Sequence, residues 1–216
     1  MDVQSIYARR FNSDLQFRQG MWRILCHDFF QQYIDEDSHV LELGAGYCEF
    51  INNIKAAHKT VVDVNPDTRK YARPDVEIIL SRASKINTLS NNSVDLVFAS
   101  NFFEHLTHNE ITATFREVHR VLRPYGRFMV LQPNIRFCAK DYWMFFDHLT
   151  PIDDRAFVEG LEVNGFEILE VIVRFLPYTT KNRLPRELWL VRLYLHLRWA
   201  WHFWGQQSFI LSRKPK

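Results

Sequence analysis

A short apolar strand that runs directly into a glycine turn is the feature that most constrains this fold. Residues 39–43 predict the strand, and Gly44-Ala45-Gly46 predicts the turn. The spacing of the next apolar residues predicts a helix that contains Phe50, Ile51 and Ile54. Glycines at such a junction let the backbone reverse tightly and let a ligand approach main-chain atoms. A tight strand-to-helix turn without a ligand is the alternative.

Strands and helices alternate along the rest of the chain. Further strands are expected at 60–64, 76–80, 94–99, 127–131, 166–175 and 208–212. Helices are expected at 15–34, 109–122 and 153–164. The alternation predicts an α/β fold with a mostly parallel sheet covered by helices on both faces. Because little helix fits a crossover before the final strand, we expect that strand to be antiparallel and at an edge of the sheet.

Composition narrows the classes of function. The 216 residues fit a single domain, and a net charge of +2 is too balanced for a nucleic-acid binder, so no nucleic-acid partner is expected. Three cysteines, Cys26, Cys48 and Cys138, lack zinc-type pair spacing and are interpreted as reduced thiols. Residues 1–10 lack the apolar region of a secretory signal, and no apolar run approaches the roughly 20 residues of a spanning helix. We therefore expect a cytoplasmic protein, 1–216 being one domain.

A carboxylate lies at the end of the second predicted strand. Asp63 comes 19 residues after Gly44, close to the spacing of roughly 20 residues in nucleotide-binding units. At the carboxyl end of a strand such a side chain can accept both hydroxyl groups of a ribose. Asp63 could equally cap the turn that begins at Asn65 and Pro66. Together with the glycine turn, the pattern favours ribose binding.

Four stretches give the chain a family resemblance. They are VLELGAGY (40–47), VVDVNPD (61–67), SVDLVFASNFFEHL (93–106) and REVHRVLRPYGRFMVLQPN (116–134). In this order they resemble the class I S-adenosylmethionine (SAM)-dependent methyltransferases, of the kind that act on small molecules or glycans. The resemblance implies SAM as cofactor and a Rossmann-like three-layer sandwich, whose seven-stranded sheet is mostly parallel with an antiparallel last strand.

The resemblance also implies roles for individual residues. Those expected around the methionine portion of the cofactor are Glu42, Gly44, Ala45 and Gly46. Asp63 would hold the ribose hydroxyls, with Val64 and Asn65 beside the adenine. Cys48 stands where relatives often have glycine, a departure that a small side chain can tolerate.

Two further strand ends complete the implied cofactor site. Arg82 and Ala83 would lie at the adenine edge, and Ser100 and Asn101 would meet the cofactor's amino group. Many relatives carry an acidic residue where Arg82 stands. Because a guanidinium cannot accept a hydrogen bond, the adenine amino group would need another acceptor, such as Ser81 or the backbone.

The residues after the fourth strand narrow the choice of acceptor atom. Methyltransferases that act on planar nitrogens often show Asn/Asp-Pro-Pro-aromatic there, whereas this chain continues from Ser100-Asn101 to two phenylalanines. The difference disfavours nucleobase or glutamine nitrogen and leaves oxygen or carbon, with a hydroxyl preferred. His105 and His148 are candidate general bases, and Asp147 is a carboxylate beside His148. Orienting a loop is the alternative role for each histidine.

No metal-ligand cluster stands out in the sequence, so we expect no metal site. Residues 135–204 are expected to form the acceptor side, with an aromatic wall that includes Tyr142, Trp143 and Phe146. Within them, 183–204 combine leucine, tryptophan and arginine and predict a lid, a homodimer face or a peripheral membrane contact. These acceptor-side residues also resemble, more weakly, those of methyltransferases that act on sugar hydroxyls.

The N-terminal residues 1–36 resemble a helical lid, with Tyr7 and Phe11 over the cofactor, although a packed helix explains them equally. Two other functions share parts of the pattern. An NAD(P)-dependent oxidoreductase would also use the glycine turn, but Glu49 replaces the third glycine of its fingerprint. A non-catalytic binding module of the same fold is the second, favoured by the departure at Arg82.

Overall fold

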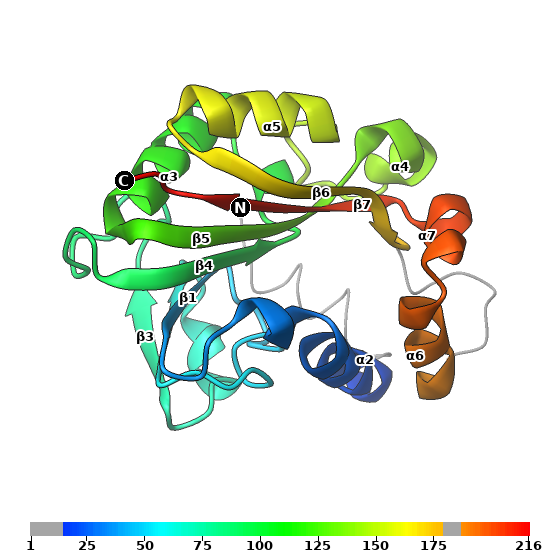
Figure 1. The fold of residues 1–216 in the computed structure, drawn as a ribbon, viewed down its shortest axis with the longest axis horizontal. Coiled ribbons are helices and arrows are strands. Elements are labelled where there is room, and N and C mark those ends of the chain that lie inside the picture. The colour runs from blue at the N-terminus through cyan, green and yellow to red at the C-terminus, as the bar shows by residue number, and fades with distance from the viewer. Residues whose placement is uncertain (1–14, 179–186) are drawn as a thin grey trace.

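A seven-stranded sheet forms the centre of the molecule (Figure 1). The computed structural model describes residues 15–178 and 187–216. The strands are β1 (His39–Leu43), β2 (His58–Asp63), β3 (Val76–Leu80), β4 (Val94–Ser100), β5 (Leu122–Pro133), β6 (Glu167–Leu176) and β7 (Gln207–Arg213). Their order is β3-β2-β1-β4-β5-β7-β6. The predicted α/β fold with an antiparallel last strand is confirmed.

The place of the last strand differs from the prediction. β7 runs antiparallel to both β5 and β6, between which it lies, so β6 and not β7 is the edge strand. Its side chains explain why: from Gln207 to Ser212 every position is buried, as befits an interior strand.

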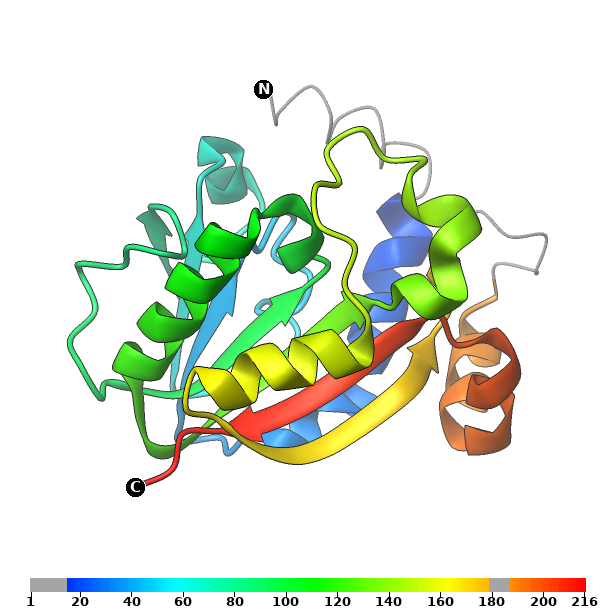
Figure 2. The ribbon, with the colours of Figure 1, turned by 90° about the horizontal axis from the view of Figure 1, so that it is seen from above.

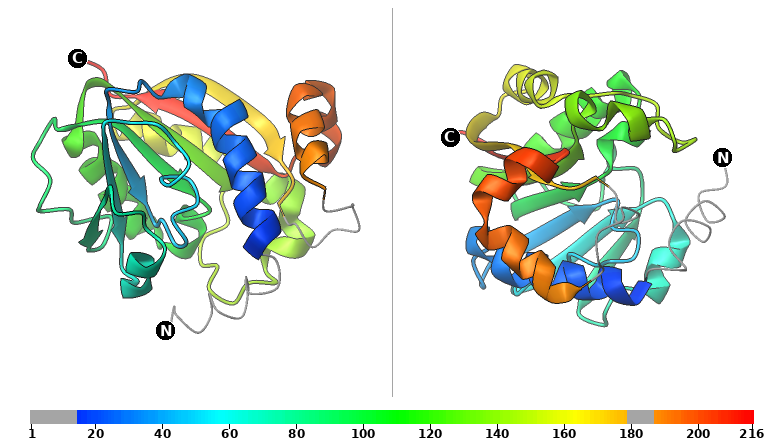
Figure 3. Two further views of the ribbon diagram at one scale, coloured as in Figure 1. Left: turned by 90° about the horizontal axis from the view of Figure 1, so that it is seen from below. Right: turned by 90° about the vertical axis from the view of Figure 1, so that its right-hand side faces the viewer.

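Helices cover both faces of the sheet (Figures 2 and 3). They are α2 (Leu15–Asp28), α3 (His108–Val121), α4 (Ile135–Tyr142), α5 (Asp154–Val163), α6 (Leu188–His196) and α7 (Arg198–Trp204), with 3-10 turns η1 (Phe30–Tyr33), η2 (Pro66–Lys70) and η3 (Phe103–His105). Strand β5 shows how the layers arise, because its side chains alternate between two cores. Met129 and Leu131 pack with α2, whereas Phe128 and Val130 pack with α3 and α5.

The basic and aromatic segment before β7 folds as α6 and α7. Helix α6 packs against α2, where a Cβ atom on Gly20 would lie 2.7 Å from Leu188 Cδ1. Arg192 pairs with Asp28 of α2 at 3.2 Å. In the part of the chain that the structure describes, no helix combines the length and the apolar character needed to cross a bilayer.

The helix expected after the glycine turn is wrong. Residues 46–53 form consecutive turns, although Phe50 and Ile51 are as buried as the helical spacing implied. The carboxylate of Glu42 accepts a hydrogen bond from the Ile51 N–H at 3.1 Å, and Cys48 N bonds the Ala45 carbonyl at 2.7 Å. A single i→i−4 bond, from Asn52 N to the Cys48 carbonyl, is present here, and the regular pattern of an α-helix is not continued.

We expect Phe98→Ala to destabilise the fold strongly. Phe98 on β4 is fully buried and stacks on Phe50 with ring centroids 3.8 Å apart. Truncating a buried phenylalanine removes about 3–5 kcal/mol from the free energy of unfolding. Urea denaturation measures this loss, and Phe203→Ala on α7, where the side chain is 65% exposed, is the matched control with an expected loss below about 1 kcal/mol.

Candidate active site

The loop after β1 is built on left-handed backbone. Gly44 and Gly46 have φ of 64° and 51°, and Cys48 has φ of 55°. A Cβ atom on Gly44 would lie 2.5 Å from Cδ2 of Phe102, so the loop after β4 packs directly on this glycine. Position 44 therefore requires glycine on two counts, and Cys48 accepts a conformation that glycine adopts at lower cost.

Asp63 ties the loop after β2 to the glycine loop. Its Oδ2 accepts a hydrogen bond from Gly46 N at 2.9 Å, and its Oδ1 accepts one from Asn65 N at 2.8 Å. The turn-capping role considered from the sequence is thus present. A carboxylate has about four lone-pair sites, so two accepted bonds leave acceptor capacity for ribose hydroxyls.

Glu42 places a second carboxylate beneath the same loop. It is 4% exposed, and it accepts the hydrogen bond from Ile51 N. Burial, together with the negative charges of Glu49 and Asp63, raises the pKa of Glu42 well above its ordinary value, although the Ile51 bond opposes this. A cationic group bound nearby would favour the ionised form.

The first turns of α2 also meet the glycine loop. Arg18 Nε lies 2.9 Å from Oε1 of Glu49, and the Arg18 guanidinium lies over the Tyr47 ring, 5.8 Å from its centroid. The helix itself is part of the core, since Leu25 and Cys26 are buried. Of the lid residues expected from the sequence, Tyr7 and Phe11 lie outside the described residues.

The loops after β2 and β3, where the adenine was expected, present a mixed surface. Val64 is 59% exposed, whereas Asn65 is buried and its Oδ1 accepts a hydrogen bond from Asp67 N. Arg82 points to solvent, with Nη1 3.9 Å from Oε1 of Glu110 at the start of α3. Ala83 is buried in the core.

The end of β4 adjoins this surface. Asn101 has φ of 47°, and its N–H donates to the carbonyl of Leu131 on β5 at 2.9 Å. The Ser100 hydroxyl lies 3.1 Å from Nδ2 of Asn101 and accepts its hydrogen bond. Both residues are half-buried, at the point where the sheet changes direction between β1 and β4. Crevices at such switch points are the usual ligand sites of α/β sheets.

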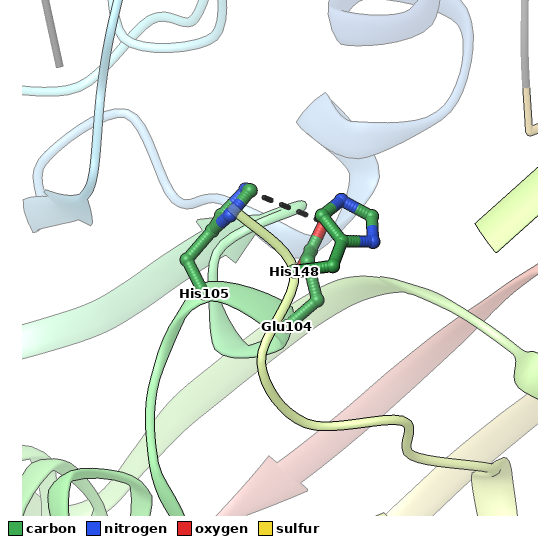
Figure 4. Close-up of side chains that lie close together, drawn as sticks. All are labelled: Glu104, His105 and His148. Atoms are coloured by element: carbon green, nitrogen blue, oxygen red, sulfur yellow. Dashed lines mark ion pairs between the residues drawn. The ribbon is translucent and has the colours of Figure 1, made fainter. Parts of the chain in front are cut away.

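Three side chains meet just beyond β4, as Figure 4 shows. Glu104 and His105 come from η3, and His148 comes from the loop after α4. One ligand atom from each lies within 4.8 Å of those of the other two. The His105 and His148 rings have centroids 5.0 Å apart.

Glu104 is the most enclosed member of this cluster. It is 1% exposed, and its Oε2 is buried without a hydrogen-bond partner. Burial raises the pKa of Glu104, against the opposing influence of His105. Its backbone carbonyl accepts hydrogen bonds from Leu149 N and Thr150 N, at 2.8 and 3.2 Å, which fasten the His148 loop onto η3.

Two expectations for this region are corrected. The Asp147 carboxylate lies 3.3 Å from Nδ1 of His105, so the group expected to support His148 pairs with the other histidine. Tyr142 was expected in an acceptor wall but is fully buried, because its hydroxyl bonds the Thr150 carbonyl at 2.5 Å and its ring lies under His148, with centroids 4.6 Å apart.

Trp143 and Phe146 are exposed, by 57% and 85%, and remain candidates for that wall. Sequence reasoning missed Glu104 as a site residue, although it directly precedes His105. Glu104 becomes a site residue because it lies beside His148, which comes more than forty residues later, and no local pattern in the sequence indicates that contact.

Comparison with known proteins identifies the family and the fold. A family model described as a methyltransferase domain matches residues 41–130, from β1 into β5. An uncharacterized methyltransferase-like protein of Schizosaccharomyces pombe is 37% identical over 100 residues, which make up 44% of this chain and 38% of the relative. The match thus spans less than half of that relative's length.

Solved structures share the whole fold. The protein bound to the Haloferax volcanii Trm112 methyltransferase activator superposes with a TM-score of 0.72 at 17% identity, over 98% of this chain and 97% of that one. A SAM-dependent methyltransferase from Archaeoglobus fulgidus gives 0.69 at 18% identity, over 94% and 98%. The family match shows that residues 41–130 form a methyltransferase domain, and the sheet order of the described chain is that of the class I SAM-dependent methyltransferases, a family whose cofactor is SAM.

Proposed function

We propose that this chain binds SAM beyond the carboxyl ends of β1 and β2 and methylates a hydroxyl oxygen of a small molecule or sugar. The observation that carries the proposal is the meeting of two sets of groups at one edge of the sheet. Buried carboxylates Glu42 and Asp63 lie at β1 and β2, and the imidazoles of His105 and His148 lie beyond β4. Strands β1 and β4 are neighbours, which brings the two sets side by side.

The residues of β1 and β2 fit the cofactor. Asp63 retains acceptor capacity for ribose hydroxyls, exposed Val64 offers an apolar surface for adenine, and Glu42 offers a negative charge to the cationic methionine portion. We also assign to SAM binding Ala45, Gly46 and the backbone of Ser81–Ala83. Bound SAM supplies a methyl group on a sulfonium, which makes that carbon electrophilic.

The residues beyond β4 suit a hydroxyl acceptor. An alcohol loses its proton on methylation, so a basic group near the oxygen assists the transfer. His105 is the better oriented imidazole, because Asp147 faces its Nδ1, and its side chain is 26% exposed while His148 is buried. Trp143 and Phe146 would pack against the acceptor.

The domain organisation follows from these assignments. We assign residues 1–216 to one domain, in which 135–204 form the acceptor side. Of the lid expected at 1–36, α2 contributes to the core, and residues 1–14 lie outside the described residues. The cytoplasm remains our proposal for its location.

Calorimetric titration with SAM and with NADH tests the cofactor assignment. We expect SAM to bind and Asp63→Ala to weaken its affinity by about tenfold to a hundredfold, or about 1.5–3 kcal/mol for lost charge-assisted hydrogen bonds. Asp67→Ala is the control, because this carboxylate lies on the same loop and pairs with Lys70 at 2.7 Å. Binding of NADH alone, or unchanged SAM affinity in Asp63→Ala, would contradict the assignment.

Glu42→Gln should stabilise the cofactor-free protein increasingly as pH rises. The folded-state pKa of Glu42 is raised by burial, so the stability contributed by its protonated form is complete below glutamate's ordinary pKa and is lost as pH rises through the raised value. Glutamine keeps an oxygen for Ile51 N but cannot ionise. Urea unfolding at a series of pH values measures the difference, with Glu159→Gln on the exposed face of α5 as control. If the difference in the free energy of unfolding between Glu42→Gln and the wild type were the same at every pH, this role of Glu42 would be refuted. The affinity for SAM should also fall in Glu42→Gln, because the negative charge is lost.

We further propose that α6 and α7 touch a membrane surface that carries the acceptor. Trp189, Trp199 and Phe203 are 61%, 60% and 65% exposed, and Arg192 and Arg198 lie among them. The wild type should therefore co-sediment with anionic liposomes, whereas the double variant Trp199→Ser/Phe203→Ser should stay in the supernatant. Equal recovery of both proteins would argue against membrane contact, and light scattering would show whether the patch instead joins two copies of the chain.

A further inference from the structure

We propose that Glu104, His105 and His148 bind a divalent transition-metal ion, with zinc the best match, next to the acceptor. The three ligand atoms lie within 4.8 Å of one another. Zinc bonds of about 2.0–2.2 Å place tetrahedral ligand atoms about 3.3–3.6 Å apart. Loading therefore draws the three groups together by about 1 Å, which small side-chain rotations provide.

The chemistry of the donors selects the class of metal. Two imidazoles and one carboxylate are a common donor set of catalytic zinc sites, which keep a fourth position open for water or substrate. Magnesium and calcium prefer oxygen ligands throughout. The mixed nitrogen and oxygen set therefore favours zinc, cobalt or iron(II) over magnesium.

The buried carboxylate is the observation that first points to a cation. Glu104 is 1% exposed and its Oε2 is buried without a hydrogen-bond partner, while its Oε1 faces Nε2 of His105 at 3.9 Å. An unsatisfied buried carboxylate oxygen carries a free-energy cost that a bound cation removes. Figure 4 shows that the two histidines lie on either side of this carboxylate.

The surroundings of His105 resemble those of metal-bound histidines. Its Nδ1 lies 3.2 Å from the Asp147 carbonyl oxygen and 3.3 Å from the Asp147 carboxylate. A histidine that donates its Nδ1 proton to such a group keeps Nε2 unprotonated and fixed in direction, as metal ligands require. Asp147 is thus a positioning residue, one step removed from the ion.

The fold holds the third ligand in place. The backbone bonds from Leu149 and Thr150 to the Glu104 carbonyl fix the loop that carries His148. The site lies beyond β4, where the proposed function places the acceptor hydroxyl, and in this respect the inference rests on that proposal. An ion here would lower the pKa of a coordinated hydroxyl so that its proton could pass to water, and His105 and His148 would then act as ligands in place of the general-base role proposed for the metal-free site.

Metal affinity measured without SAM or acceptor tests the site directly. Chelator-treated full-length protein is titrated with zinc in competition with a chromophoric chelator. We expect one zinc per chain, with no comparable binding of magnesium. Asp147→Asn should weaken zinc binding by about tenfold to a hundredfold, and Glu104→Gln and His148→Asn should weaken it further. His108→Asn is the matched control, because this exposed histidine lies three residues from His105.

Cobalt substitution of the wild type keeps the test independent of folding defects in the variants. The absorption of bound cobalt should indicate nitrogen and oxygen ligands without a thiolate band. A thiolate band, variants that bind zinc as tightly as the wild type, or magnesium bound as tightly as zinc would overturn the site. SAM binding without zinc binding would remove this inference alone, whereas zinc binding without SAM binding would remove the proposed function alone.

Discussion

The left-handed backbone at the end of β1 is the constraint on which the rest of this edge depends. Residues 44, 46 and 48 all have positive φ, which turns the chain back beneath the sheet. The Gly46 N–H thereby reaches Asp63 on β2, and the bare Cα of Gly44 receives Phe102 from the loop after β4. One local conformation thus fixes three strand ends relative to one another. Any side chain at position 44 would separate β1 from the loop that leads to Glu104 and His105.

The parts of the fold that could be predicted are those that depend on local periodicity. Strands β1 to β4 were expected within two residues of where they lie, because each is a short apolar run bounded by turn residues. Helix α3 begins at a capping box formed by Thr107 and Glu110, a local signal. Asp63 was expected at the end of a strand, 19 residues after Gly44, and it is the last residue of β2.

The errors have a common physical origin in contacts between distant residues. The turns at 46–53 depend on Glu42, whose buried carboxylate accepts a hydrogen bond from Ile51 N. Strand β7 is an interior strand because β6 pairs with the side of β7 that faces away from β5 and forms the edge of the sheet. Pairing of Asp147 with His105 and burial of Tyr142 arise only once the loop after α4 is fastened to η3. Adjacency in sequence was a poor guide in each case.

Cys48 places a thiol in the glycine loop at a position with positive φ. Its thiol is fully buried, with Sγ 3.8 Å from the Thr68 carbonyl oxygen. Burial, reinforced by the charges of Glu42 and Asp63, raises the pKa of the Cys48 thiol far above its ordinary value. Oxidants and alkylating reagents attack the thiolate, so this sulfur is chemically inert while the protein is folded. The loop therefore carries a cysteine without becoming redox-sensitive, and labelling of Cys48 would report unfolding of the loop.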